Sequence, residues 1–128
     1  IPAGKSFIAH LIEDAGGDYF WKEDTKTGSS AQSFETVYAK AKDCDIWINL
    51  YNINSKKELL SYDERYGLFK ACKDHPLYNN NKTQNALGYS NYWETGITNP
   101  DEVLADLIAI FSPELMPAHK FVFYKKIE

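Results

Sequence analysis

Segments with helical periodicity alternate along this chain with short runs of strand-forming residues, and this alternation limits the folds available to it. The clearest run extends from Ile46 to Tyr51, with turn-forming residues on either side. Shorter extended segments are expected at Leu77–Tyr78 and at Phe121–Tyr124. Such an alternation is typical of α/β domains in which helices cover a mainly parallel sheet. We therefore expect residues 1–128 to form a single α/β domain, a three-layer sandwich with a mainly parallel sheet.

The expected helices have recognisable starts. Serine and asparagine side chains accept hydrogen bonds from the free backbone N–H groups at the beginning of a helix. Helix starts of this kind are expected at Ser6, Ser33, Ser55 and Asn99. Pro100 strengthens the last of them, because proline suits the first helical position. A further helix is expected from Asp63 to Lys73.

The composition argues against two classes of partner. The net charge is −4 and the Lys and Arg residues form no cluster, whereas nucleic-acid binding needs a concentrated basic surface. No apolar run approaches the roughly 20 residues that span a bilayer. Aromatic residues make up 15% of the chain, so we expect some of them to line a ligand surface as well as the core.

No metal or cofactor site is expected in this chain. Its two cysteines, Cys44 and Cys72, lack the close spacing of metal ligands, and its three histidines form no metal-binding motif. Buried free thiols are the simpler interpretation of the cysteines, and a disulfide between them stays open in an oxidising compartment.

A ligand site is expected at one edge of the predicted sheet. In open α/β sheets, ligands bind beyond the carboxyl ends of the strands. The loops expected at that edge are Trp21–Ser33, Tyr51–Asn54 and Asn79–Trp93. Within the last two, aromatic rings can stack on a ligand and amide groups can orient it. The candidate ligand-binding residues are Tyr51, Asn52, Asn54, Asn91, Tyr92 and Trp93.

A succession of short segments resembles the carboxy-terminal lobe of the periplasmic solute-binding proteins that serve iron-siderophore and cobalamin ABC importers, especially the Bacteroidetes-type members. Their order and spacing match over nearly the whole chain, although no single motif is decisive. The segments are Leu11–Gly17, Ser33–Val37, Asp43–Ile48, Asn91–Glu94, Pro100–Asp101, Leu104–Leu107 and Pro113–Leu115.

The resemblance implies the second, Rossmann-like lobe of a two-lobed binding protein, with the amino-terminal lobe outside these residues. It implies a ferric siderophore, haem or cobalamin as ligand, an ABC permease as partner, and no enzymatic activity. It also implies a periplasmic location, with a lipid anchor on the full-length protein left open. Glu35 matches the acidic residue with which this lobe docks on the permease.

Two other functions compete with the transport hypothesis. A glycoside hydrolase would need two carboxylates facing each other across a cleft, for which Glu94 and Asp101 are the nearest candidates. Asp101 is better explained as an acid that favours a helix start. A carbohydrate- or protein-binding domain unrelated to transport is the third hypothesis, and ligand screening separates it from the first.

Overall fold

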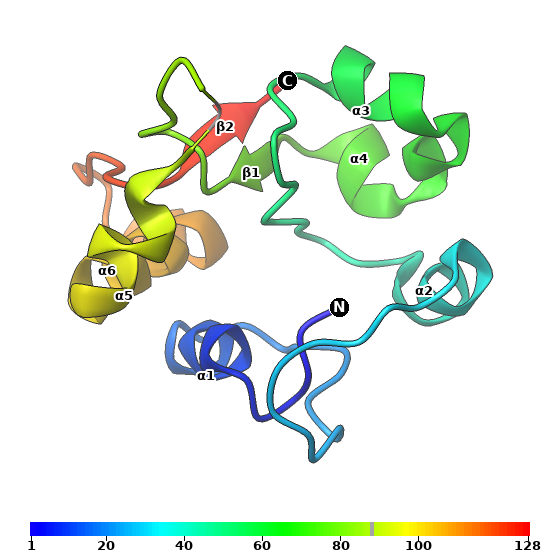
Figure 1. Ribbon diagram of the computed structural model, residues 1–128, viewed down its shortest axis with the longest axis horizontal. Helices are drawn as coiled ribbons and strands as arrows, with labels where there is room; N and C mark the ends of the chain where they lie inside the picture. Colours follow the sequence, from blue (N-terminus) through cyan, green and yellow to red (C-terminus); the bar gives the residue numbers. More distant parts are fainter. Residues whose placement is uncertain (88) are drawn as a thin grey trace.

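The computed structural model describes residues 1–87 and 89–128 (Figure 1). Helices dominate the described chain, and strands are few and short. The elements are α1 (Phe7–Asp14), α2 (Phe34–Ala41), α3 (Lys56–Tyr62), η1 (Glu64–Leu68), α4 (Lys70–Asp74), β1 (Leu77–Asn79), η2 (Asn91–Trp93), α5 (Thr95–Thr98), α6 (Pro100–Phe111), η3 (Pro113–Leu115) and β2 (Lys125–Ile127).

Three of the predicted helix starts are confirmed together with their capping bonds. The hydroxyl of Ser6 accepts from the Ala9 N–H, that of Ser33 from Thr36, and that of Ser55 from Glu58. The fourth helix also begins where expected, at Pro100, but the side chain of Asn99 does not cap it. Its amide instead donates to the carbonyl of Thr95, 2.7 Å away.

The predicted three-layer sandwich with a mainly parallel sheet is wrong. Among the described residues the sheet has two strands, and β1 and β2 run antiparallel with Tyr78 opposite Lys126. The segment expected as the central strand touches this sheet at a single point, where Ile48 forms an isolated parallel bridge with Tyr78.

Backbone conformation explains why Ile46–Tyr51 does not continue as a strand. Asn49 and Tyr51 have φ angles of 63° and 57°, which lie in the left-handed region and turn the chain out of an extended path. The strand propensity of the segment is therefore overridden after Ile48.

The single helix expected at Asp63–Lys73 is divided into two shorter elements, η1 and α4.

The carboxy-terminal segment is organised by one buried carboxylate. Asp106 of α6 is fully buried, and its oxygens accept from the backbone N–H groups of Val122, Phe123 and Tyr124 at 2.7–3.2 Å. The Nε2 atom of His119 lies 2.7 Å from the same carboxylate. These bonds hold Phe121–Tyr124 in an irregular path, so the expected extended segment is displaced along the chain and the strand forms at Lys125–Ile127.

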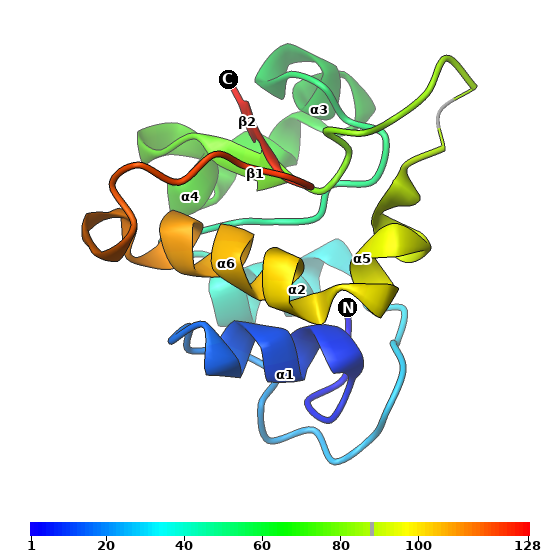
Figure 2. The ribbon, with the colours of Figure 1, turned by 90° about the vertical axis from the view of Figure 1, so that its left-hand side faces the viewer.

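The apolar side chains form two clusters. The first joins α1 and α6 with the segment around Phe123 and Tyr124. Figure 2 shows α6 between α1 and the β1–β2 pair. The second gathers side chains from α2, α3 and α4 with Leu77 and Ile127 of the two strands. The two strands therefore lie between a cluster centred on α6 and a cluster centred on α4.

Both cysteines lie in or beside the second cluster as free thiols, and burial raises the pKa of each. Within residues 1–87 and 89–128, no helix is both long and apolar enough to cross a membrane.

We predict that Asp106→Asn lowers the free energy of unfolding by roughly 2–4 kcal/mol, because it removes a charged acceptor from several buried N–H groups. Urea unfolding followed by tryptophan fluorescence measures the change. Asp101→Asn is the matched control, since Asp101 is exposed in the first turn of the same helix. Equal losses for the two variants would contradict this account of the carboxy-terminal segment.

Candidate functional site

Two of the three loops predicted to line a ligand site meet in the structure. The fully buried side chain of Asn79 joins them: its Oδ1 accepts from the Leu50 N–H at 2.7 Å. Its Nδ2 donates to the carbonyl groups of Tyr51 and Ile53 at 2.8 and 2.9 Å. One amide therefore uses both its acceptor and its donors to hold the 49–53 backbone against the end of β1.

A second layer of amide contacts lies outside Asn79. The Nδ2 atom of Asn81 lies 3.2 Å from Oδ1 of Asn54, and Nε2 of Gln84 lies 2.7 Å from Oδ1 of Asn52. Lys125 of β2 donates to Asn54 Oδ1 at 2.6 Å. The loops are thus held together mainly by side chains. We call the surface formed by residues 51–54, 83–85 and 91–93 the rim.

The rim presents aromatic and amide groups to solvent. Tyr51 is 84% exposed and Trp93 is 61% exposed. Asn52, which directly follows Tyr51, is also exposed, and its side-chain oxygen accepts a hydrogen bond from Gln84. An aromatic face beside fixed amides can bind a flat or amphipathic ligand by stacking and hydrogen bonding.

The other predicted ligand residues support the rim from within. Asn91 accepts a hydrogen bond from the Thr83 hydroxyl, which closes the base of the 83–91 loop. Tyr92 is only 1% exposed, and its ring packs edge-on against Trp93 with ring centres 4.9 Å apart. Tyr92 also contacts Phe123 and Tyr124 edge-on, so it connects the rim to the first hydrophobic cluster.

The third predicted loop, Trp21–Ser33, lies elsewhere. It runs beside the amino terminus, where Pro2 and Ser29 form an antiparallel bridge and Trp21 donates to Gln32. Figure 1 shows this segment at the opposite end of the molecule from β1 and β2. The structure therefore does not bring it to the rim.

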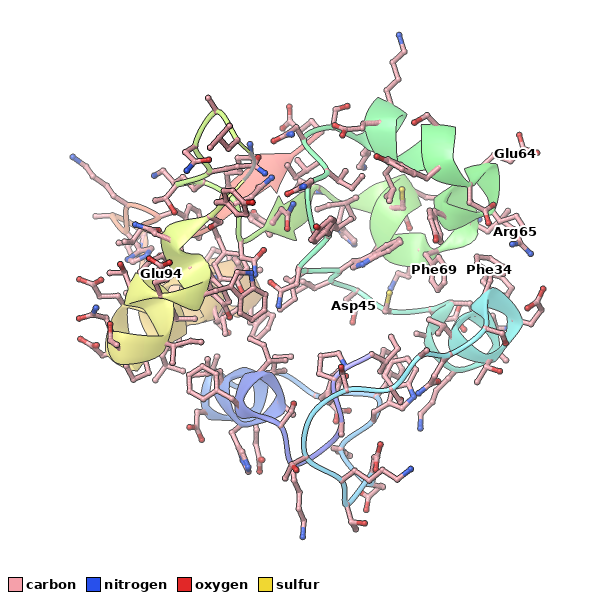
Figure 3. All side chains as sticks on the ribbon, in the orientation of Figure 1. Phe34, Asp45, Glu64, Arg65, Phe69 and Glu94 are labelled. Atoms are coloured by element: carbon pink, nitrogen blue, oxygen red, sulfur yellow. The ribbon has the colours of Figure 1, made fainter. Side chains whose placement is uncertain are left out.

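Glu35, the predicted docking residue, is exposed in the first turn of α2. Its Oε1 lies 3.2 Å from the guanidinium of Arg65, which also pairs with Asp63 at 2.7 Å. The Arg65 guanidinium stacks 4.2 Å above the ring of Phe34, and Figure 3 shows these two residues on neighbouring elements. Hydrogen bonds from Arg65 lower the pKa of Asp63. Glu35 is thus accessible, with one exposed cation beside it.

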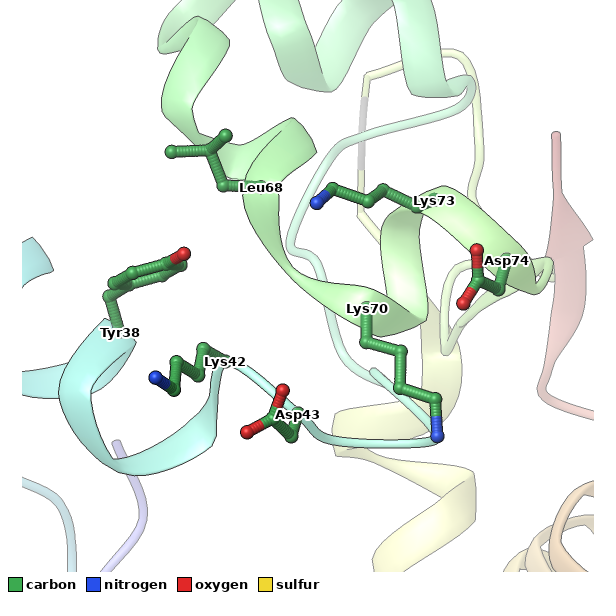
Figure 4. A pocket seen from close by; sticks show the side chains of 7 residues that line it. All are labelled: Tyr38, Lys42, Asp43, Leu68, Lys70, Lys73 and Asp74. Atoms are coloured by element: carbon green, nitrogen blue, oxygen red, sulfur yellow. The ribbon is translucent and has the colours of Figure 1, made fainter.

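Two open hollows lie away from the rim, and no predicted site residue lines either of them. One, of about 370 Å³, lies between α2 and α4 and has a mixed lining of lysines and aspartates (Figure 4). The other, of about 330 Å³, is lined mainly by apolar residues that include Ile46, Pro76 and Ile110. In the described part of the chain, His, Cys, Asp and Glu side chains form no group able to hold a metal ion.

Three residues that organise these surfaces were missed by sequence reasoning. Asn79 resembles any other residue of an Asn-rich loop, and nothing in its local sequence marks it as buried. Asp106 interrupts the apolar face of α6, and an acid among buried helix positions was a usable signal. Arg65 is the chain's only arginine, but its approach to Glu35 depends on tertiary structure.

The chain is similar to an uncharacterized lipoprotein of Methanocaldococcus jannaschii, with 28% identity over 127 residues. The match covers 98% of this chain but only 29% of the lipoprotein, so the chain spans less than a third of that relative. No protein-family model and no solved structure matches the chain.

The buried hydroxyl of Tyr92 gives the structure a dependence on alkaline pH. Burial raises the pKa of Tyr92 from 10.0 to about 12. The folded state therefore keeps a proton that the unfolded state loses first, and the associated stability is present below pH 10 and is lost as the pH rises from 10 through 12.

We predict that wild type loses about 2 kcal/mol more stability than Tyr92→Phe between pH 9.5 and 12. Urea unfolding at a series of pH values gives the two curves. Tyr62→Phe, which changes an exposed tyrosine of α3, should follow wild type. Parallel curves for wild type and Tyr92→Phe would show that this hydroxyl does not contribute.

Proposed function

We propose that the chain is the second lobe of a solute-binding protein that delivers an iron chelate or a related metal-chelate ligand to an ABC importer. The resemblance of the segments quoted above suggests this role. The relative is named a lipoprotein, and the chain spans 29% of it. On this proposal residues 1–128 belong to a longer protein that a lipid anchor holds at the outer face of the cell membrane.

The observation that carries the proposal is the joining of two loops by Asn79. Loops with aromatic and amide side chains bind a ligand well only if the framework below them holds still. The buried Asn79 side chain supplies that framework through four hydrogen bonds to backbone groups. The exposed Tyr51 and Trp93 rings then provide the contact surface on each loop.

The charges near the rim are compatible with an anionic chelate held partly by another lobe. Lys82 and Lys125 donate to uncharged oxygens, those of Phe121 and Asn54. Neither lysine has a carboxylate within ion-pair distance among the described residues. The chain's only arginine lies on the α2 side, so this lobe brings no guanidinium to the rim. A ferric siderophore is our first choice, and cobalamin or haem are alternatives within the same role.

Carbohydrate binding is a second candidate function. Exposed tyrosine and tryptophan rings beside neutral amides, as at Tyr51, Asn52 and Trp93, also suit the apolar faces and hydroxyl groups of a sugar. Saccharide binding without any response to metal chelates would favour this candidate.

Glu35 is the proposed contact with the permease. An exposed carboxylate on the first turn of a helix has a fixed position and can pair bidentately with an arginine of a partner. Its bond to Arg65 is exposed and therefore weak, because solvent screens such pairs. A partner's arginine can replace Arg65 at little energetic cost.

In the longer protein, we predict that one ligand among ferric siderophores, haem and cobalamin quenches tryptophan fluorescence saturably, and that Tyr51→Ala weakens its binding about tenfold. Loss of one stacked ring accounts for a change of that size. Tyr62→Ala is the matched control, because Tyr62 is 73% exposed on α3, outside the rim. No response to any of the three ligands would reject the proposed transport role.

We further predict that Glu35→Ala lowers ligand-stimulated ATP hydrolysis by the reconstituted importer at least about tenfold, as expected for a lost charge-assisted contact. The affinity for ligand should not change, since Glu35 does not belong to the rim. Glu64→Ala is the control: Glu64 is exposed next to Arg65, and the described residues give it no ion pair. Equal ATPase activity in both variants would reject docking through Glu35.

A further inference from the structure

Arg65 is held in place by two contacts that do not involve Glu35. Its Nε and Nη2 atoms donate to the carboxylate of Asp63 at 2.7–3.1 Å, and its backbone N–H donates to the same carboxylate at 3.0 Å. The guanidinium also stacks on Phe34, 4.2 Å from the ring centre. A guanidinium that is paired along one side and stacked on an aromatic ring keeps one orientation. Arg65 is therefore a fixed cation at the surface.

Phe34 connects this cation to the hydrophobic core. Its ring stacks on Tyr38 and meets Phe69 edge-on, with ring centres 5.6 and 5.8 Å apart. Phe69 is buried in the second hydrophobic cluster, and Phe34 packs against that cluster. Figure 3 shows Arg65 at the outer edge of the molecule, with Phe34 and Phe69 on its inner side. Core packing therefore fixes the position of the guanidinium together with the charge of Asp63.

The bond between Arg65 and Glu35 is more exposed than the bonds to Asp63. Nη1 of Arg65 donates to Oε1 of Glu35 at 3.2 Å, and the side chain of Glu35 is 75% exposed against 24% for Asp63. Solvent screens an exposed ion pair, so this bond contributes little. If a partner's arginine binds Glu35, as proposed above, Asp63 and Phe34 still hold Arg65 in place.

The Arg65 guanidinium has a second fork that Asp63 leaves open. Arginine carries five N–H donors, and Asp63 accepts from those on the Nε side. The Nη1 side keeps donors that a partner would cover as it binds Glu35. Covered donors without an acceptor weaken binding. A carboxylate fits such a fork with two parallel hydrogen bonds, so the geometry favours an acidic residue on the partner.

We infer that Arg65 is a second docking residue, which pairs with a carboxylate on the partner next to the arginine that binds Glu35. The inference deepens the proposed function and rests on it, since the partner is the permease of that proposal. Docking then exchanges one exposed pair within the lobe for two pairs with the partner, while Asp63 and Phe34 keep their contacts. If Arg65 only competed for Glu35, its removal would strengthen docking.

Binding of the longer protein to the reconstituted importer tests this inference. We expect Arg65→Gln to raise the Kd for the importer at least about tenfold. Arg65→Lys should raise it nearly as much, because lysine keeps the charge but cannot fork to Asp63 and to the partner at once. Unchanged or tighter binding by Arg65→Gln would overturn the inference. Wild-type binding by Arg65→Lys would also overturn it, since only the net charge would then matter.

Lys22→Gln is the matched control for the lost charge. Lys22 is an exposed cation that pairs with Asp18 at 2.7 Å, and it lies in the Trp21–Ser33 loop away from Arg65. This variant should bind the importer as wild type does. A tenfold loss in Lys22→Gln as well would assign the effect to overall charge and count against docking through Arg65.

Glu35→Ala, measured in the same assay, separates this inference from the proposed function. Weaker binding by Glu35→Ala with normal binding by Arg65→Gln would overturn the inference and leave docking through Glu35 in place. The reverse result would reject docking through Glu35 and support Arg65 as the docking group. If wild type does not bind the importer, both the transport role and the inference are rejected.

Substitutions on the permease identify the carboxylate. Exposed Asp and Glu residues near its docking arginines are changed to Ala one at a time. We expect one of these changes to weaken the binding of wild type about tenfold and to leave the binding of Arg65→Gln unchanged, because the pair is already lost in that variant. If the loss from every acidic residue adds to the loss from Arg65→Gln, the proposed pairing is wrong.

Discussion

The buried carboxylate of Asp106 is the contact on which the arrangement of the carboxy-terminal quarter depends. An ionised group without water is stable only when several donors surround it, and here three successive backbone N–H groups and His119 do so. By fixing Val122–Tyr124 against α6, the carboxylate brings the following residues alongside β1. The small sheet is therefore a consequence of a polar contact within the first hydrophobic cluster.

Asn79 has the corresponding role at the other end of β1. Asn79 is the last residue of β1, and its side chain holds the 49–53 loop. Asp106 positions the residues that lead into β2, and β2 pairs with β1. Both side chains are fully buried: Asn79 bonds to backbone groups, and Asp106 bonds to backbone N–H groups and to the ring of His119. The rim and the carboxy-terminal segment thus share one polar framework, with the proposed contact residues exposed around it.

Local signals predicted local structure well and tertiary structure poorly. Helix starts at Ser6, Ser33 and Ser55 depend on side chains within three residues, so the sequence pattern was sufficient. The parallel sheet was wrong because left-handed conformations at Asn49 and Tyr51, held by Asn79, end the expected central strand. At the site, the meeting of two loops was anticipated, but Asn79, which joins them, and the burial of Tyr92 depend on distant contacts that no local pattern encodes.

The positive φ angles at Asn49 and Tyr51 have a consequence for recognition. A non-glycine residue in this region stores about 1 kcal/mol or more, and it stays there only where its surroundings leave no alternative. The backbone that presents the Tyr51 ring has therefore lost its conformational freedom during folding. A ligand that stacked on this ring, as proposed, would order little additional chain, so most of the entropy lost on association would come from the ligand.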